Sequence, residues 1–448
     1  MFNMEYIDIF ESYLINIPIV GKAIAAIIAI YAINEIINKI TLEKINPLSK
    51  LASFIPVFGR SYRYSIRKKY YKTLETQEFI MWEYDVLKKI YKEHNFTNIL
   101  SVDYPIVCYE TAAICRYPFE KIYNKADLDT NMNTEFKISS RIEKEYSKIV
   151  REQIKRPGLP GFMLKKLKLD ENNKIISFSA NTGTYEQNVY TSHILEYELY
   201  KAFVSKKINL SLLDSDNILE LLPLRNNIHK GKTESEVLTT GTGRKSLIGV
   251  QMLVLYKYEH SSKNQYKILF IKRSEDVAAK PGFYQFVPSG GFEIFENEQA
   301  INNMDMLPYV LKNNYSLDKA LFRELVEEIF GEDEFIHNIN GVPSDNILAN
   351  EHVLSIIEMI SKKEASFEFL GSTIDLVGLR HELSFILRID NCDFSKKSFK
   401  PNHESSNIET CLISEIEEIG INKKLNQGSA GLLYLAKKNH LFKEVENN

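Results

Sequence analysis

The chain has 448 residues, of which 44% are hydrophobic and 26% are charged, so it has a globular composition and the length of two or three domains. Its formal net charge of -3 provides no general basic field, so we expect no specific nucleic-acid partner. The cysteines form no C-x-x-C pair, which argues against a zinc knuckle or a redox motif; their positions are Cys108, Cys115, Cys392 and Cys411.

Residues 13–33, YLINIPIVGKAIAAIIAIYAI, form an apolar segment of about the length that crosses a bilayer. Lys22 near its middle costs about 3 kcal/mol of insertion free energy, which the isoleucines offset. No basic region precedes the segment, which disfavours a signal peptide. The segment therefore predicts membrane contact through a single anchor within residues 1–60. The alternative is a buried or self-associating apolar helix, and self-association would make the protein a homo-oligomer.

The charges that flank this segment predict an orientation. Glu5, Asp8 and Glu11 precede it, whereas lysines and arginines follow it from Lys39 to Lys69. Because basic flanks stay on the cytoplasmic side, we expect an anchored chain to hold its remaining residues in the cytoplasm.

Residues 61–245 predict an accessory domain that is mainly helical at first and then α+β. The clearest helical stretch is QEFIMWEYDVLKKIYKEH, and a second helix begins after Ser139 or Ser140, either of which can cap it. RPGLPGF ends that helix, and strands and helices alternate beyond it. TGTGRKS at 240–246 resembles the end of a phosphate-binding loop, but Arg244 stands where the last glycine belongs, so we interpret it as a turn.

Residues 246–448 begin with a predicted hairpin and continue into a loop and a helix that are rich in glutamate. VQMLVLYKY and YKILFIKRS are apolar runs separated by EHSSKNQ, which is typical of paired strands. VPSGGFEIFE then places Gly290 and Gly291 where a backbone can approach a ligand closely, with Glu293 and Glu296 beside them.

The stretch RELVEEIFG at 323–331 predicts an amphipathic helix with one acidic face. Leu317, Leu321, Leu325 and Ile329 recur every four residues and form an apolar stripe. The glutamates at i, i+3 and i+4 share another face, which we expect to point away from the core: Glu324, Glu327 and Glu328. Alone, such a face is typical of a solvated helix surface with an Arg323–Glu327 pair. Three fixed carboxylates are also suited to binding a hard divalent cation.

The loop and helix together resemble the Nudix hydrolase signature G-x5-E-x7-R-E-U-x-E-E-x-G-U, where U is a bulky aliphatic residue. Gly290 and Glu296 match the first part, and Arg323, Glu324, Leu325, Glu327 and Glu328 match the second. The resemblance covers residues 246–443 and implies an α/β/α sandwich with a mixed sheet. The chain departs from the signature twice, because residues 297–322 fill a spacer of seven and Gly331 follows one position late.

The resemblance implies an enzyme, a diphosphohydrolase that cleaves a nucleoside diphosphate linked to another moiety. The residues that would hold Mg²⁺ or Mn²⁺ are Glu324, Glu327 and Glu328, with support from Glu293 and Glu296. Arg323 would orient the glutamates, and Gly290 and Gly291 would line the substrate. Glu404 and Glu409 are candidate general bases, as are the helix glutamates. The alternative is a nucleotide-sensing module coupled to a membrane-associated N-terminal effector region.

Overall fold

The structure is a computed structural model of the chain. It describes residues 56–130, 140–152, 154, 158–260, 263–273, 282–294, 296, 301, 303, 305–332, 344–400, 405–417 and 425–446. Two compact units divide the chain, Met1–Lys72 and Thr73–Asn448. The apolar segment at 13–33 lies outside the described residues. None of the helices that the structure does describe combines the length and the apolar character needed to span a bilayer.

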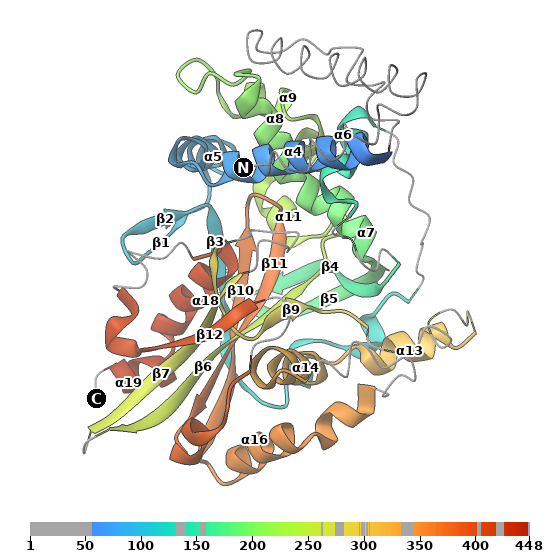
Figure 1. Ribbon diagram of the computed structural model, residues 1–448. Coiled ribbons are helices and arrows are strands. Elements are labelled where there is room, and N and C mark those ends of the chain that lie inside the picture. The colour runs from blue at the N-terminus through green and yellow to red at the C-terminus, as the bar shows by residue number, and fades with distance from the viewer. Residues whose placement is uncertain are drawn as a thin grey trace, which may run out of the picture. The chain divides into compact units, whose positions relative to one another are not determined.

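A ten-stranded mixed sheet, counted over the described residues, organises the second unit (Figure 1). Its main path runs β12-β7-β6-β11-β10-β3-β5-β4, and β8 and β9 pair with β7 and β6. The β6–β11 and β3–β5 pairs are parallel, whereas the others are antiparallel. The strands are β3 Ile106–Arg116, β4 Pro160–Leu169, β5 Ile175–Thr184, β6 Gly249–His260, β7 Lys263–Arg273, β8 Tyr284–Phe286, β9 Ser289–Gly291, β10 Ala365–Asp375, β11 Arg380–Ile389 and β12 Ser405–Leu412. A separate hairpin pairs β1 Thr97–Ile99 with β2 Val102–Tyr104.

Helices dominate the N-terminal part and flank the sheet, which confirms the predicted α/β class. Ser140 caps α6 in a reciprocal capping box with Glu143, as its position before an amphipathic run predicts. The α-helices are α4 Pro56–Leu74, α5 Gln77–Ile90, α6 Arg141–Val150, α7 Tyr185–Asn188, α8 Ile194–Val204, α9 Ser215–Glu220, α10 Pro223–His229, α11 Glu234–Thr239, α13 Leu307–Asn314, α14 Leu317–Phe330, α16 Glu351–Ser361, α18 Gln427–Lys438 and α19 His440–Glu446.

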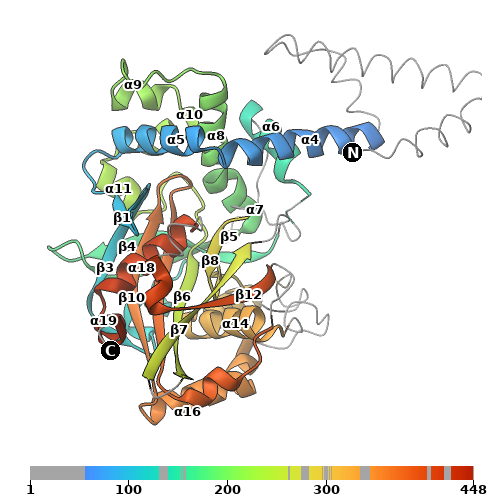
Figure 2. The same cartoon turned by 60° about the vertical axis from the view of Figure 1, so that its left-hand side comes forward.

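The central strands bury both faces under helices, α18 on one side and α14 with α16 on the other (Figures 1 and 2). Leu253 and Leu255 of β6 belong to one apolar cluster with Leu433 of α18. On the other face, the rings of Phe322 in α14 and Phe367 in β10 lie 5.9 Å apart. Because side chains alternate along a strand, each central strand supplies apolar residues to two layers. The predicted sandwich of helices around a mixed sheet is thereby confirmed.

The predicted apolar stripe of α14 is fully packed. Leu317, Leu325 and Ile329 are 0% exposed and Leu321 is 1% exposed. Gly331 ends the helix in the left-handed conformation with φ 66°, so the displaced glycine acts as a C-cap one residue late.

Replacing Leu325 by alanine should lower the free energy of unfolding by about 2–5 kcal/mol, because a buried side chain is lost and a cavity remains. Urea denaturation followed by circular dichroism measures the change. Leu354→Ala on α16 is a matched control, since Leu354 is 51% exposed, and it should cost less than about 0.5 kcal/mol. Equal effects of the two substitutions would contradict the packing of α14.

Strand pairing crosses the domain boundary that we expected between residues 245 and 246. β3 pairs with β10 from Ile106↔Asp375 to Arg116↔Glu368. Two backbone hydrogen bonds also join β4 to residues beyond 245. Phe162 N donates to Phe292 O, and Leu164 N donates to Ser246 O. Residues 73–245 therefore share one sheet with the residues that carry the glutamate-rich loop.

Two buried arginines hold the turn between β10 and β11 by its carbonyl oxygens. Arg225 is 0% exposed and donates from Nη1 to Leu376 O at 2.8 Å and from Nη2 to Val377 O. Arg244 donates from Nε to Leu379 O at 3.0 Å. The TGTGRKS stretch is thus a turn, as interpreted, and its arginine packs inward against backbone.

Asp318, in the first turn of α14, provides a second link across the expected boundary. Its Oδ1 accepts a hydrogen bond from Phe119 N at 3.1 Å in a buried environment. Burial raises the pKa of this carboxyl from 3.8 to about 6, although the Phe119 N–H opposes the shift. The folded protein therefore binds this proton more tightly than the unfolded chain does, and the resulting stability is lost as the pH rises through about 6.

Asp318→Asn should consequently stabilise the protein at neutral pH by about 2 kcal/mol relative to the wild type, since a two-unit pKa shift corresponds to roughly 2.7 kcal/mol. The amide oxygen still accepts from Phe119 N, while no buried charge forms. The gain should shrink as the pH falls to about 4. Urea denaturation at both pH values measures it, and a gain independent of pH would contradict the assigned ionisation.

Candidate active site

The glutamate-rich loop and helix lie against each other because β9 pairs with β6 beside α14. Val250 of β6 is the register partner of Gly290, and Gln251 is the partner of Ser289. Ser316 begins α14 by accepting from Lys319 N at 3.4 Å. The residues between loop and helix include α13, so the long spacer forms its own helix and still returns the chain to β9.

Gly290 is required by the close approach of Glu324. A Cβ atom on Gly290 would lie 2.1 Å from the carboxyl carbon of Glu324 and 2.2 Å from its Oε2. Such distances are far below van der Waals contact, so only glycine leaves room for the carboxylate. The loop glycine and the first helix glutamate are therefore in direct contact, although 26 residues separate Glu296 from Arg323.

Arg323 and the backbone of β9 hold the three helix glutamates. Arg323 Nη2 donates to Glu324 Oε1 at 2.8 Å, and its Nε lies 3.8 Å from Glu327 Oε1. The same Nη2 reaches Gly291 O at 3.4 Å. Glu328 Oε2 accepts from Ser289 N at 2.7 Å. The structure thus brings Arg323, all three glutamates and the loop together, with the arginine placed to orient carboxylates.

The expectation that the acidic face points away from the core is wrong. Glu324 is 8% exposed, and Glu327 and Glu328 are each 4% exposed. β9 covers this face of the helix, so both faces of α14 are buried. A carboxylate is costly to bury without partners, and the contacts to Arg323 and Ser289 N supply them.

Glu293 and Glu296 have contacts of their own in the loop. A Cβ on Gly291 would lie 3.0 Å from the carboxyl carbon of Glu293. Gly290 and Gly291 face opposite sides of β9, so Glu293 lies on the face away from Glu324. Glu296 Oε1 accepts from Asn314 Nδ2 at 3.2 Å, at the end of α13.

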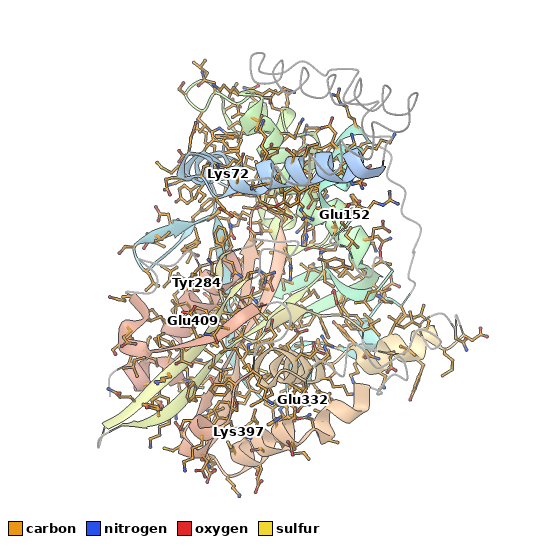
Figure 3. The ribbon with its side chains drawn as sticks, viewed as in Figure 1. Lys72, Glu152, Tyr284, Glu332, Lys397 and Glu409 are labelled. Atoms are coloured by element: carbon orange, nitrogen blue, oxygen red, sulfur yellow. The ribbon has the colours of Figure 1, made fainter. Side chains whose placement is uncertain are left out.

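The later candidate bases have separate positions. Glu409 lies on β12, where its register partner is Phe270, and Glu404 lies outside the described residues. Figure 3 labels Glu409 and, at a separate place, Glu332, which follows the C-terminus of α14 and accepts from Asn350 Nδ2 at 2.8 Å. Of the helix glutamates, Glu324 and Glu328 contact the glycine loop directly, and Glu327 lies beside Arg323.

The three helix carboxylates supply the hard oxygen donors that Mg²⁺ and Mn²⁺ bind. Within the described ranges, no group of three or more His, Cys, Asp or Glu side chains is already arranged as a metal centre. The donor chemistry therefore fits a divalent cation. In this structure, however, the Glu324 carboxylate is paired with Arg323, and the Glu328 carboxylate accepts from Ser289 N.

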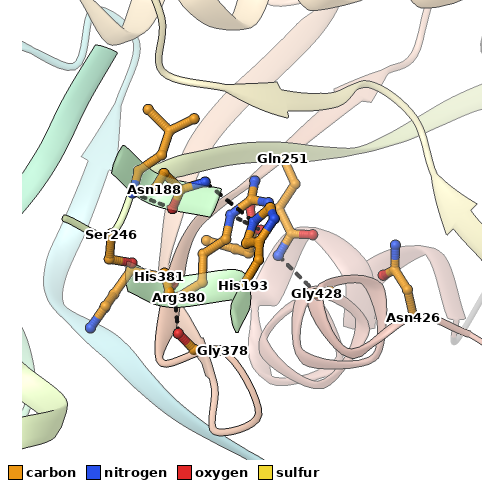
Figure 4. A network of polar contacts seen from close by, with 12 residues as sticks. Asn188, His193, Ser246, Gln251, Gly378, Arg380, His381, Asn426 and Gly428 are labelled. Atoms are coloured by element: carbon orange, nitrogen blue, oxygen red, sulfur yellow. Dashed lines mark hydrogen bonds and ion pairs between the residues drawn. The ribbon is translucent and has the colours of Figure 1, made fainter. Parts of the chain in front are cut away.

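A second polar network, which the sequence analysis missed, connects β6, β7, β8, β11 and the start of α18. We call it the β11 network, and its members are Gln251, Arg273, Gln285, Arg380, Glu382 and Asn426. Arg380 Nε lies 3.1 Å from Glu382 Oε1, and Gln251 Nε2 donates to Gly428 O at 2.9 Å (Figure 4). Gln285 Oε1 accepts from Asn426 Nδ2 at 2.8 Å and also from Arg273 Nη1.

Burial shifts two titratable groups at this network. It raises the pKa of the Glu382 carboxyl, against the opposing effect of Arg380. It lowers the pKa of neighbouring His193 to about 3, with further lowering by Arg380 and Arg273, so this imidazole is neutral at physiological pH. The signal in the sequence was that Gln251 interrupts the apolar run VQMLVL and that Glu382 follows two other polar residues, Arg380 and His381.

Comparison with known proteins does not identify a family for the chain. No family model matches the chain, and a search of curated proteins found no match. Among solved structures, the chain is similar to the NUDIX domain of Shewanella oneidensis NrtR complexed with ADP ribose. The two share 14% identity, and the match covers 44% of this chain and 88% of that one, with a TM-score of 0.25. A likeness at this TM-score carries no argument about the chain.

Proposed function

We propose that the protein is a metal-dependent hydrolase that cleaves a diphosphate bond in a nucleoside diphosphate linked to another moiety. The observation that carries the proposal is the fit between loop and helix. Glu324 occupies the space that a side chain at Gly290 would need, and Glu328 is bonded to Ser289 N at 2.7 Å. A solvated helix surface would have no reason to place carboxylates against a glycine loop.

In this proposal Glu324, Glu327 and Glu328 hold Mg²⁺ or Mn²⁺, and the cation neutralises the diphosphate and activates water when it is bound. Arg323 keeps the carboxylates oriented through its 2.8 Å contact to Glu324. Gly290 and Gly291 let the backbone approach the substrate closely. Glu293 and Glu296 support the loop from its other side and from α13.

The test is a hydrolysis screen of the full-length protein over a panel of nucleotides with Mg²⁺, with Mn²⁺ and with EDTA, with products identified by mass. The panel includes ADP-ribose, dinucleotides and nucleoside triphosphates. We expect cleavage between two phosphates of at least one nucleotide, abolished by EDTA. Nucleotide binding without turnover in either metal would instead support the sensing module.

Gly290→Ala should lower that turnover roughly 100-fold, because a displaced catalytic group can cost that much. The new methyl group would force the Glu324 carboxylate out of its position beside β9. Gly158→Ala is the matched control, since nothing lies within 4 Å of its added methyl group. Normal turnover in Gly290→Ala would show that the contact between Gly290 and Glu324 has no catalytic role.

A further inference from the structure

The last residue of the spacer helix and the two residues that follow it contact three parts of the candidate active site. α13 ends at Asn314, shortly before α14 begins (Figure 1). Asn314 Nδ2 donates to Glu296 Oε1 at 3.2 Å. The ring of Tyr315 stacks on that of Phe292, with 5.4 Å between the ring centres and 16° between the planes. Ser316 then caps α14. The end of the insertion therefore connects the glycine loop to the helix that carries the glutamates.

The carboxamide of Asn314 uses both of its N–H groups. Besides Glu296 Oε1, its Nδ2 donates to Val310 O at 3.0 Å, within α13. Because a carboxylate and a carbonyl are both acceptors, the nitrogen of the amide faces them and the oxygen does not. Asn314 is 6% exposed, so little water competes for these bonds. The bond to Val310 O fixes the direction of the second N–H, and Glu296 lies in that direction.

Tyr315 anchors the joint between the two helices in the sheet. Tyr315 is 0% exposed, and the centres of its ring and of the Phe162 ring in β4 are 4.8 Å apart. Phe292, on which Tyr315 stacks, directly follows β9, and its backbone N donates to Ile248 O at 2.8 Å. Rings packed this closely cannot shift without opening a void. Asn314 is thus fixed from both sides, by α13 before it and by Tyr315 after it.

Glu296 lies just beyond the part of the loop that is bonded to the sheet by its backbone. Ile294 N donates to Pro160 O at 3.0 Å, which ties the loop to β4. Glu296 follows two positions later, and there a side chain, that of Asn314, forms the contact. This carboxylate is also the one that matches the spacing G-x5-E from Gly290.

An amide is suited to orienting a carboxylate without cancelling its charge. A lysine or arginine side chain in its place would form an ion pair, whereas a neutral N–H fixes one oxygen and leaves the negative charge. A carboxylate that is fixed in this way keeps its attraction for a divalent cation. Hydrogen bonds that orient metal ligands typically change metal affinity or activity by roughly 10–100-fold.

We propose that Asn314 is a positioning residue of the candidate active site. Its amide fixes the Glu296 carboxylate, and Tyr315 fixes Asn314 in turn, so the insertion completes the site that it interrupts in the sequence. The proposal rests on the proposed function, in which Glu296 supports the cation site. It goes further by giving the inserted residues a role that acts through Glu296.

The experiment compares full-length variants by two readouts. One is the binding of Mn²⁺ alone, followed by electron paramagnetic resonance, and the other is turnover at a series of Mn²⁺ concentrations. Asn314→Ser removes the contact to Glu296 and keeps a donor for Val310 O, because a serine hydroxyl can donate to the carbonyl four residues earlier in a helix. Asn314→Leu keeps the volume and removes both contacts. Each substitution is combined with Glu296→Gln in a double-mutant cycle.

Asn350→Ser is the matched control for these variants. Asn350 Nδ2 also holds a carboxylate, that of Glu332 at 2.8 Å, but beyond the C-terminus of α14. Asn350 caps α16 through its side-chain oxygen, and serine can take over that cap. The control therefore removes the same kind of amide–carboxylate contact outside the candidate active site.

We expect Asn314→Ser and Asn314→Leu each to raise the Mn²⁺ concentration for half-saturation roughly tenfold or more in both readouts. In the Glu296→Gln background the same substitutions should have little further effect, because the charge that Asn314 orients is already gone. Asn350→Ser should match the wild type. A merely structural role of Asn314 would lower the melting temperature and leave the Mn²⁺ affinity unchanged. Unchanged affinity, or effects of the two positions that multiply, would overturn the proposal.

The two readouts separate this proposal from the proposed function. If the wild type binds Mn²⁺ but hydrolyses no nucleotide, the proposed function fails, and the Mn²⁺ titrations still decide the role of Asn314. If the wild type hydrolyses nucleotide and both Asn314 variants bind Mn²⁺ as it does, this proposal fails and the proposed function stands. A wild type with neither hydrolysis nor Mn²⁺ binding overturns both. Should Asn314→Leu not fold, Asn314→Ser decides, since it retains the bond within α13.

Discussion

Glu327→Gln and Glu328→Gln should each lower the turnover of diphosphate hydrolysis about 100-fold or more. A cation that neutralises the diphosphate stabilises the transition state by several kcal/mol, and each 1.36 kcal/mol corresponds to a factor of about 10 in rate. Glutamine keeps the volume and one oxygen of glutamate but loses the charge that binds the cation. The measurement is steady-state turnover on whichever nucleotide the screen identifies, with Mg²⁺ at saturation.

Both variants should remain folded. The reason is not exposure, because these side chains are buried. The two side chains are each 4% exposed, so stability depends on the isosteric replacement. In Glu328→Gln, the new amide oxygen would still accept from Ser289 N, which Glu328 binds at 2.7 Å. Circular dichroism and thermal melting check the fold.

Glu332→Gln is the matched control for these variants. Glu332 follows the same helix, but its described contacts are to Asn350 Nδ2 at 2.8 Å and His352 Nε2 at 3.4 Å. The turnover of Glu332→Gln should equal that of the wild type. Unchanged turnover in both Glu327→Gln and Glu328→Gln would remove the catalytic interpretation of α14.

Local patterns predicted the elements whose identity depends on neighbours in the sequence. The hairpin β6–β7 follows from two apolar runs separated by a polar segment, the stripe of α14 from helical periodicity, and its delayed cap from the left-handed preference of glycine. The stretches FEFLGSTIDLVGL and HELSFILRI are rich in apolar residues, and they form most of β10 and β11. Each of these signals lies within a window of some ten to fifteen residues.

Long-range pairing was beyond such windows. Nothing in the sequence near Glu324 shows that β9 would cover it, because that contact depends on the pairing of Val250 with Gly290. The β11 network likewise requires β6, β11 and α18 to meet, so in the sequence Gln251 and Glu382 were two polar residues with no evident connection. Signature residues could be predicted as a set, whereas their burial could not.

The role of residues 61–245 shows the same limit, because the expected domain boundary rested on the resemblance, which begins at residue 246. The strand partners of β10 reveal otherwise. β11 covers one edge of β10 and β3 covers the other. β4 binds Phe292 O and Ser246 O, directly beside the glycine loop. The accessory residues are therefore part of the sheet that positions the candidate active site.

A fragment of residues 246–448 should consequently fail to fold as a stable monomer, whereas residues 61–448 should fold and keep hydrolysis. The shorter fragment lacks β3, so β10 loses its neighbouring strand from Glu368 to Asp375. A strand edge without a partner promotes aggregation. The shorter fragment also lacks Arg225, which leaves the carbonyls of Leu376 and Val377 without their buried donors. Removing residues 1–60 deletes the predicted anchor and none of the signature residues.

Gel filtration, circular dichroism and the hydrolysis assay on both fragments test this expectation. Residues 61–448 should elute as a folded species with the turnover of the full chain, since its sheet retains β3, β4 and β5. Residues 246–448 should aggregate or show no cooperative melting. If the shorter fragment melts cooperatively and hydrolyses nucleotide at the full rate, the strands before residue 245 are dispensable. If the longer fragment is folded but inactive, residues 1–60 contribute to catalysis, and their assignment as an anchor alone is wrong.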